Sequence, residues 1–269
     1  MNSSTYLFPL ASLFTLIATL AVWEPLRREP RFGAKVIPWL LSVSIILGVY
    51  GLMALEPIVA GGISFRLSAA VATCTLMVLM IYLVGILRHE VQGLGLFLLP
   101  LISLILLTIP LLPESEAVLI HTRSPLETGH ILIALIAYAL LTLAAIHALM
   151  HIQLDRALKR KQISRLMQHM PSLVDIEIHM FAQVRWVVWL LGIGIAFGLS
   201  WQWQSMGHLE VLHHKMLLSF IAWAVLLWLV TVQRGGKIRG NKASRMVLTA
   251  YVLLLLAYFG VKLVKTWLQ

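Results

Sequence analysis

The sequence predicts an all-α fold: a polytopic integral membrane protein, built as a helical bundle of about eight transmembrane helices with both termini external. Two observations carry this prediction. Hydrophobic residues make up 60% of the chain and charged residues only 12%, which lies outside the usual composition of soluble domains. The apolar residues also form blocks of about 20, the length that a helix needs to cross the hydrocarbon core of a bilayer.

The apolar blocks follow one another along the chain. We interpret each as a transmembrane helix, and together they cover residues 6–23, 36–55, 67–87, 93–112, 130–150, 184–204, 214–233 and 246–264. The first block is not expected to be a cleavable signal peptide. No basic region precedes it, and Trp23-Glu24-Pro25 lacks the small residues of a cleavage site.

The distribution of basic residues predicts the orientation in the membrane. Fifteen of the 21 Lys and Arg residues lie in the connections that follow odd-numbered blocks. Short basic connections stay in the cytoplasm, so both termini are expected outside. We expect the chain to lie in the cytoplasmic (inner) membrane of a bacterium. The net charge of +10 then reflects membrane topology, and we expect membrane lipid, not nucleic acid, to surround this chain.

We expect two segments of four spans each. Residues 1–113 form the N-terminal segment, and residues 114–269 form a second segment with two external loops. The longest break between blocks, DRALKRKQISRLMQHMPSLVDIEIH, is basic and amphipathic. It is predicted to lie as a helix on the cytoplasmic surface.

Histidines mark the external ends of two blocks in the second segment. His130 begins the fifth block, one helical turn after Glu127. His208, His213 and His214 lie in GHLEVLHHKM, where the seventh block begins. Histidine is a good ligand for haem iron, but a neutral imidazole at the edge of a bilayer is also a common boundary residue. The positions alone leave both interpretations open.

Other residues of this segment have a structural and a functional interpretation. Trp201 and Trp203 lie where an aromatic belt is expected, and they also offer a flat apolar surface to a porphyrin. Gly192, Gly194 and Gly198 are expected to let the sixth helix approach a neighbour closely.

A polar cluster is predicted at the cytoplasmic ends of the fifth and sixth helices. Its members offer ligands to a divalent cation, although solvated helix ends are the preferred explanation. They are His147, His151, Asp155, Asp175, Glu177 and His179.

Three stretches in residues 120–264 resemble the cytochrome c assembly family of haem-handling membrane proteins, and in particular its short, eight-span YpjD-type branch. RSPLETGHILIALIAYALLTLAAIHAL resembles the family's helix that opens with an external histidine. FGLSWQWQSMGHLEVLHHKMLLSFIAW resembles its Trp-rich loop and following helix, with Leu212-His213-His214-Lys215-Met216 in place of Trp-Asp-Pro-Lys-Glu. GNKASRMVLTAYVLLLLAYFGVK resembles its closing helix, without the second external histidine that follows in many members.

The resemblance implies a protein that binds haem as its cofactor and assists cytochrome c assembly together with other cytochrome assembly proteins. It implies that His130 is an axial ligand of the haem iron, that Trp201 and Trp203 flank the macrocycle, and that Lys215 pairs with a propionate. We predict His214 as the second ligand, because it and His130 each open a helix from the external side. His213 is the neighbouring alternative.

Two other functions remain open. The chain is alternatively a transporter or exporter of haem or of a divalent metal, or a non-catalytic scaffold subunit of a membrane complex. An enzyme is not expected, since the sequence contains no Ser-His-Asp set, carboxylate dyad or nucleotide-binding loop.

Overall fold

The computed structural model divides the chain into two compact units. Unit 1 comprises residues 1–120 with 157–171, and unit 2 comprises residues 121–156 with 172–269. The structure describes residues 4–24, 36–55, 58–59, 62–64, 67–88, 92–112, 119–120, 125–161, 170–207, 214–235 and 238–257.

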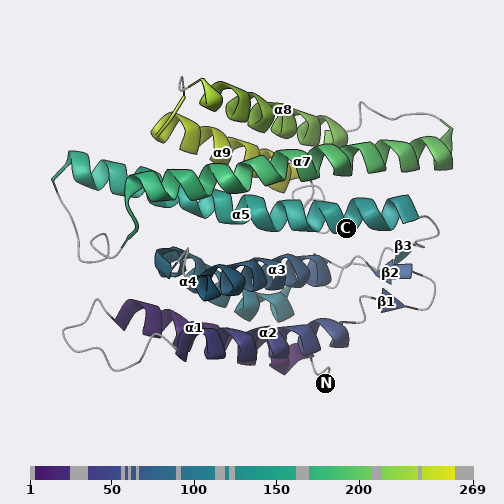
Figure 1. Ribbon diagram of the computed structural model, residues 1–269. Helices are drawn as coiled ribbons and strands as arrows, with labels where there is room; N and C mark the ends of the chain where they lie inside the picture. Colours follow the sequence, from purple (N-terminus) through teal and green to yellow (C-terminus); the bar gives the residue numbers. More distant parts are fainter. Residues whose placement is uncertain are drawn as a thin grey trace. The chain divides into compact units, whose positions relative to one another are not determined.

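Unit 1 contains four α-helices in its described residues, as the first four apolar blocks predict (Figure 1). The fourth is a short α-helix with Pro100 inside it, and a 3₁₀ turn on each side lengthens the apolar segment. The elements are α1 (Ser4–Trp23), α2 (Val36–Ala54), α3 (Leu67–Leu87), η2 (Gln92–Leu94), α4 (Gly95–Thr108) and η3 (Ile109–Leu111).

Small and hydroxyl-bearing side chains hold the helices of unit 1 together. The hydroxyl oxygens of Thr15 in α1 and Ser44 in α2 lie 2.7 Å apart. The hydroxyl group of Ser12 donates a hydrogen bond of 2.7 Å to the carbonyl oxygen of Ser103 in α4. In a bilayer the lipid is as apolar as the side chains, so close backbone approach and hydrogen bonds replace the hydrophobic effect between helices.

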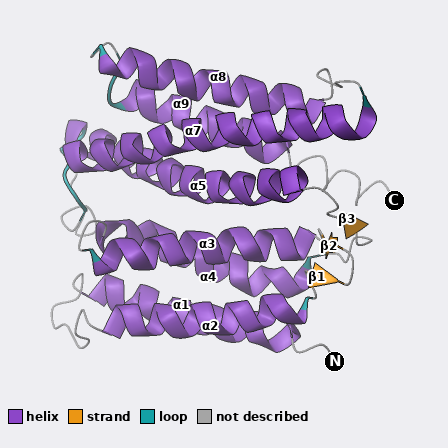
Figure 2. Cartoon of the chain, turned by 45° about the vertical axis from the view of Figure 1, so that its right-hand side comes forward, coloured by secondary structure: helices purple, strands orange, loops and turns teal. Residues whose placement is uncertain are grey.

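Three short strands form a small antiparallel sheet that the sequence did not predict. They are β1 (Ile58–Val59), β2 (Gly62–Ser64) and β3 (Leu119–Ile120), in the order β1-β2-β3. The first two follow α2 and the third precedes α5, and they lie together beyond the helix ends (Figure 2). Because these strands pair, the connections after the second and fourth helices lie on the same side. This is expected of a chain in which every helix crosses the membrane.

Unit 2 has four α-helices in its described residues, two of them longer than predicted. They are α5 (Pro125–Lys159), α7 (Leu173–Met206), α8 (His214–Arg234) and α9 (Asn241–Leu255). The 35 residues of α5 correspond to about 50 Å, well beyond the ~30 Å of a bilayer core. The two ends of the segment predicted as an amphipathic surface helix, residues 155–159 and 173–179, instead continue α5 and α7, so the prediction is wrong there. Residues 162–169 lie outside the described part.

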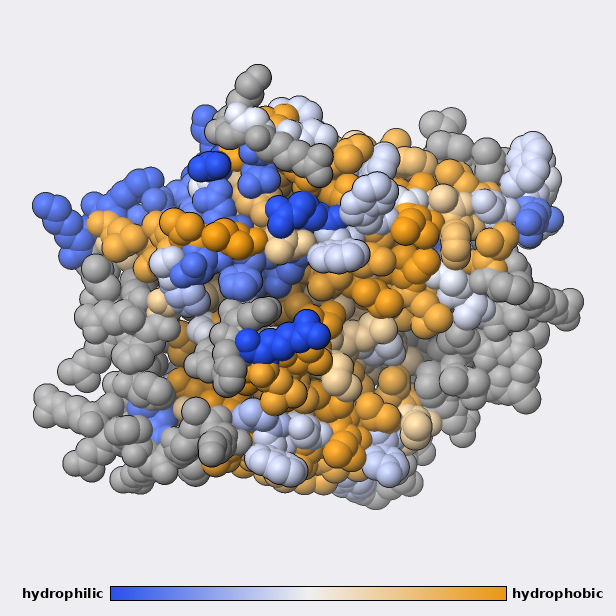
Figure 3. Space-filling model, in the orientation of Figure 1, coloured by the Kyte–Doolittle hydropathy of each residue, from blue (hydrophilic) through white to orange (hydrophobic). Residues whose placement is uncertain are grey.

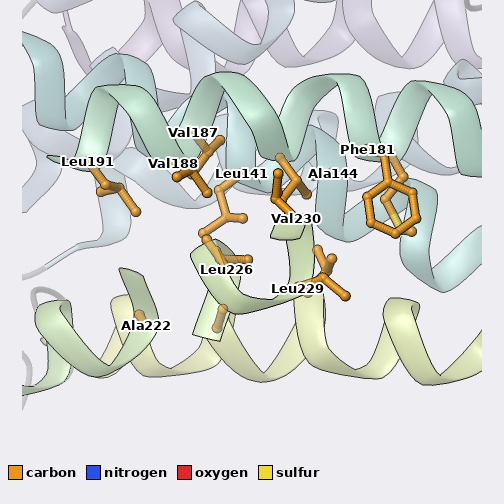
Figure 4. Packing of buried hydrophobic residues seen from close by; sticks show 14 of the residues in the cluster. Leu141, Ala144, Phe181, Val187, Val188, Leu191, Ala222, Leu226, Leu229 and Val230 are labelled. Atoms are coloured by element: carbon orange, nitrogen blue, oxygen red, sulfur yellow. The ribbon is translucent and has the colours of Figure 1, made fainter. Parts of the chain in front are cut away.

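The core of unit 2 consists of apolar side chains that interleave from all four helices. Figure 4 shows Leu141 of α5, Val187 of α7 and Leu226 of α8 directed toward one another. Val247 of α9, like Leu141 and Leu226, is 0% exposed. This packing fixes which faces of α5 and α7 meet, and it thereby positions the polar groups at both ends of that pair.

Many large apolar side chains of the described helices are exposed, as a lipid environment requires. In the described residues, six helices are long and apolar enough to cross a membrane, and Gly95–Leu111 is a shorter apolar helix. Hydrophobic residues cover much of the face in Figure 3, and hydrophilic residues gather over the end of α5 at the left. The prediction of an integral helical membrane protein is confirmed; the last predicted span, 246–264, is described only as far as residue 257.

Candidate functional site

Two histidine contacts show that α5 and α7 run antiparallel. Near its start, α5 places His130 against Gly194 and Gly198 of α7. Further along, His147 of α5 stacks on His179 of α7, with ring centroids 5.9 Å apart. The sequence predicted histidines at both ends of this helix pair, and each end engages α7 in a different way.

At the predicted external end, the imidazole of His130 is partly buried and hydrogen-bonded. Its Nδ1 lies 2.6 Å from the carbonyl oxygen of Gly194. A carbonyl oxygen only accepts, so Nδ1 carries the proton and donates it to this bond. In the neutral ring the other nitrogen, Nε2, then has a free lone pair. The contact therefore selects the tautomer in which Nε2 can bind a metal.

Glycines create the space in which the ring of His130 lies. A Cβ atom added to Gly198 would lie only 3.0 Å from both Nδ1 and Cε1 of the ring. On the opposite helix, a Cβ at Gly129 would lie 2.9 Å from the ring of Phe197. Each helix therefore inserts an aromatic ring next to a glycine of its neighbour. The predicted packing role is confirmed for Gly198 and for Gly192, where a Cβ would lie 3.3 Å from Nε1 of Trp223. A Cβ at Gly194 would make only an ordinary contact of 3.5 Å with Ile133, and the Gly129–Phe197 contact was not predicted.

His130 lies deeper than the first residue of a span. The helix α5 begins at Pro125, five residues earlier, and the ring is level with Gly194–Gly198 on α7. Trp201 lies three residues beyond Gly198, so the imidazole is roughly one to two turns below the predicted aromatic belt. It is thus enclosed by two helices.

The two predicted tryptophans lie on different sides of α7. Trp201 follows Gly194 by seven residues, which places it on the same helical face, and it is half-buried. Trp203 points away from that face and is 61% exposed. It lines an open surface hollow with Leu199, Ser200 and Gln204. The structure brings Trp201, but not Trp203, to the face of α7 on which His130 lies.

His214 and Lys215 open α8, as expected. Their side chains, together with His208 and His213, lie outside the described part of the structure. The depth of α8 follows from Trp223, whose Nε1 donates to the carbonyl oxygen of Val188, 3.0 Å away. His214 is nine residues before Trp223 on a helix antiparallel to α7, so its backbone lies within about one turn of the depth of His130.

Two histidines of the polar cluster at the other end of α5 and α7 are buried. His147 and His151 are 3% and 4% exposed. The Oδ2 atom of Asp155 accepts a hydrogen bond from Asn241, and Oε1 of Glu177 accepts one of 3.4 Å from the backbone N–H of Gly240. These carboxylates hold the start of α9, where Gly240 offers no side chain as a cap.

The cluster does not form a metal centre. Among the residues that the structure describes, no three His, Cys, Asp or Glu side chains are placed to hold a metal ion. Asp175 is exposed and hydrogen-bonds Ser172 at the start of α7. The divalent-cation interpretation of this cluster is therefore not supported, and the alternative of solvated helix ends is wrong for His147 and His151.

Comparison with known proteins gives the chain a family. The model of a family described as cytochrome C assembly protein matches residues 38–268. The chain is 31% identical over 176 residues to the inner membrane protein YpjD of Escherichia coli K12, covering 64% of this chain and 65% of the relative. It is 30% identical over 152 residues to protein HemX of Brevibacillus brevis, covering 55% and 56%.

An uncharacterized 28.8 kDa protein of Azospirillum brasilense is 38% identical over 138 residues, covering 50% of each chain. The chain thus spans between half and two thirds of the length of these curated relatives. The family match, in contrast, covers most of the chain. It includes the part of unit 2 in which the site lies. The chain belongs to the cytochrome c assembly protein family, and it is an integral protein of the bacterial inner membrane.

Proposed function

We propose that this chain is a membrane haem-binding protein that assists cytochrome c assembly, with Nε2 of His130 as an axial ligand of the haem iron. The hydrogen bond between Nδ1 of His130 and the carbonyl oxygen of Gly194 supports this most directly. A histidine that binds a metal almost always donates its other N–H to a carbonyl or carboxylate group, which fixes the tautomer and orients the ring.

The surroundings of His130 fit this role in two further ways. The contact with Gly198 restricts the imidazole plane, so the ring is held in place before any ligand binds. The half-buried Trp201, on the same face of α7, offers an apolar ring for the macrocycle to pack against. Trp203 points away from this face, so we do not include it.

We propose His214 as the second axial ligand. His130 and His214 would hold the iron from two separate helices, because a single helix cannot provide both imidazoles. His214 begins a separate helix whose backbone lies within about one turn of the depth of His130. His213, the adjacent residue, would point about 100° away from His214 on a continued helix. Lys215, which follows, is proposed to pair with a propionate of the haem.

The proposed protein carries haem and performs no catalysis. Bound haem would be held until another cytochrome assembly protein takes it, so the expected partners are other members of that machinery. Iron in a bis-histidine haem has a characteristic visible spectrum, which distinguishes this function from its alternatives.

The test is the visible spectrum of the purified full-length protein and of His130→Ala. A Soret band in the wild type that is lost in His130→Ala supports the proposal. Bound divalent metal without haem would indicate a metal transporter instead. If the protein purifies with neither haem nor metal and binds no added haem, the proposed haem-binding function is wrong and the scaffold function is favoured.

A further inference from the structure

Arg185 is an exposed arginine of α7, within the part of this helix that is apolar enough to cross a membrane. Its neighbours on the exposed face are large and apolar. Trp186 and Trp189 are 66% and 71% exposed, and Ile193, two turns along the helix, is also exposed. Arg185 is thus a charged side chain among apolar side chains that lie outside the core of unit 2.

The described helices around Arg185 offer it no counter-ion. Residues 178–206 of α7 contain no Asp or Glu, and neither do α8 and α9. The two carboxylates at the start of α7, Asp175 and Glu177, have hydrogen-bond partners of their own. Among the described residues, none forms a hydrogen bond or an ion pair with the guanidinium group. An arginine on the apolar surface of a membrane helix is costly without a polar partner, so we look for this partner outside these helices.

Hydrogen bonds to α8 and α9 give the depth of Arg185. Trp223 of α8 bonds the carbonyl oxygen of Val188, and Arg185 lies about 5 Å from this contact toward the predicted cytoplasmic side. The end of α8 lies about 16 Å from the contact in the same direction. At the start of α9, the backbone N–H of Gly240 bonds Glu177, which lies about 12 Å beyond Arg185. Arg185 is therefore about 12 Å on the membrane side of the basic connection between α8 and α9.

Exposed tryptophans of α7 and α8 lie at this depth. Trp186 and Trp189 flank Arg185, and Trp228 of α8, which is 51% exposed, follows Trp223 by five residues. Five residues of α8 rise about 8 Å, so Trp228 and Arg185 lie within about one turn of each other in depth. Tryptophans on the outside of a membrane protein gather at the level of the lipid headgroups. This belt therefore indicates that lipid phosphates come close to Arg185.

The length of the exposed face of α7 supports the same depth. Trp203 follows Arg185 by 18 residues, or five full turns, so the two lie on one helical face, about 27 Å apart. This distance is close to the ~30 Å of a hydrocarbon core, with a tryptophan near each border. The Cα–Cβ bonds of a helix tilt toward its N-terminus, so the side chain of Arg185 extends toward the cytoplasmic headgroups.

We propose that Arg185 and the tryptophans beside it bind the phosphate group of an anionic phospholipid in the cytoplasmic leaflet. The planar guanidinium group donates two parallel N–H bonds to phosphate oxygens, while Trp186 and Trp189 pack against the glycerol and the upper acyl chain. An anionic headgroup is favoured over a zwitterionic one, because it carries no ammonium group that competes for the phosphate. The site lies about 14 Å along α7 from Gly194 and is independent of haem.

The experiment measures lipid binding to the full-length protein in detergent by native mass spectrometry. Dioleoyl phosphatidylglycerol and dioleoyl phosphatidylethanolamine, which share their acyl chains, are titrated separately. The wild type is expected to bind phosphatidylglycerol more tightly, and Arg185→Gln should bind it about fivefold more weakly, the effect of one cation at an anionic surface. Arg156→Gln removes the same charge at an exposed position of α5 beyond the tryptophans. It is the control and should bind both lipids as the wild type does.

Three results would overturn the proposal. Equal binding of the two lipids by the wild type would leave a carboxylate of a partner helix as the counter-ion of Arg185. An equal loss in Arg185→Gln and Arg156→Gln would assign the effect to net charge. Should Arg185→Gln not fold, Arg185→Lys is measured, which keeps the charge without the planar fork. Its affinity for phosphatidylglycerol should fall below that of the wild type, and an unchanged affinity is the third contrary result. Haem content should be unchanged in both Arg185 variants, so the outcome does not depend on the proposed function.

Discussion

The two ends of the α5–α7 pair each place a histidine of α5 against α7, but the two imidazoles are held in different ways. At one end, Nδ1 of His130 donates to the carbonyl oxygen of Gly194 on the opposite helix. At the other end, Nδ1 of His147 donates to the carbonyl oxygen of Leu143, one turn back on its own helix. His179 of α7 stacks on the ring of His147.

This difference explains why one residue type has two roles on a single helix. His147 is 3% exposed and its ring stacks on His179, so it is a structural histidine that connects α5 to α7. For His130, the structure fixes one nitrogen and leaves the other unassigned. The two residues differ in what holds the ring, which is a carbonyl oxygen of the opposite helix for His130 and a carbonyl oxygen of its own helix for His147.

The prediction with the largest expected effect concerns which end of the α5–α7 pair lies at the external face of the membrane. Reporter fusions after Gln162 and Asn241 are expected to be cytoplasmic, and a fusion after Gln269 external, because basic connections stay inside. Alkaline phosphatase and green fluorescent protein fusions measure this directly. An external signal at Asn241 would place His130 at the cytoplasmic face and reverse the assignment of the two ends.

A larger side chain in the space beside His130 should lower both the stability of the protein and its haem content. In Gly198→Val the added atoms meet the imidazole ring, since even a Cβ would lie 3.0 Å from it. We expect a loss of about 1–3 kcal/mol in the free energy of unfolding and loss of bound haem. Thermal unfolding in detergent and the haem-to-protein ratio measure the two effects. Ala196→Val, on the exposed face of α7, is the control and should change neither.

At the opposite end, a change should affect stability alone. Asp155→Ala removes the acceptor of the hydrogen bond from Asn241, which holds the start of α9. The expected loss is about 1–3 kcal/mol, because a hydrogen bond to a charged group is lost and the amide is left without its partner. Haem content should stay at the wild-type level. Gln153→Ala, an exposed position of α5, serves as the control for the thermal unfolding measurement.

The smallest expected effect is on haem in the double variant His147→Ala, His151→Ala. His147 is 17 residues from His130, a rise of about 25 Å along α5, so neither residue reaches the proposed site. The haem-to-protein ratio should be unchanged, even though the buried cluster is disrupted. A marked fall in this ratio, in a variant that still folds, would move the site to the cytoplasmic end.

Much of the fold could be predicted because a membrane restricts the choices. Apolar blocks of about 20 residues gave the eight helices, with starts and ends close to those observed for α1, α2, α3 and α8. The extra length of α5 and α7 was not predicted. The last turns of α5 and the first turns of α7 are polar, and this pattern is typical of a helix on the membrane surface. The small sheet was missed because strands of two or three residues carry no pattern.

The site could be predicted in part for a related reason. His130 and the glycines of α7 were identified from their types and spacing. The contact of Phe197 with Gly129 was not, because lipid-facing and core-facing side chains are both apolar, so periodicity does not mark the packed face of a membrane helix.

The central claim is that His130, and not His147, supplies an iron ligand, and rescue by free imidazole tests it most directly. His130→Ala and His147→Ala are purified with and without imidazole, and the Soret band of each is compared. The claim predicts that His130→Ala loses the wild-type band and regains it with imidazole, while the band of His147→Ala is present and unchanged in both conditions. A wild-type band in His130→Ala without imidazole would contradict the claim.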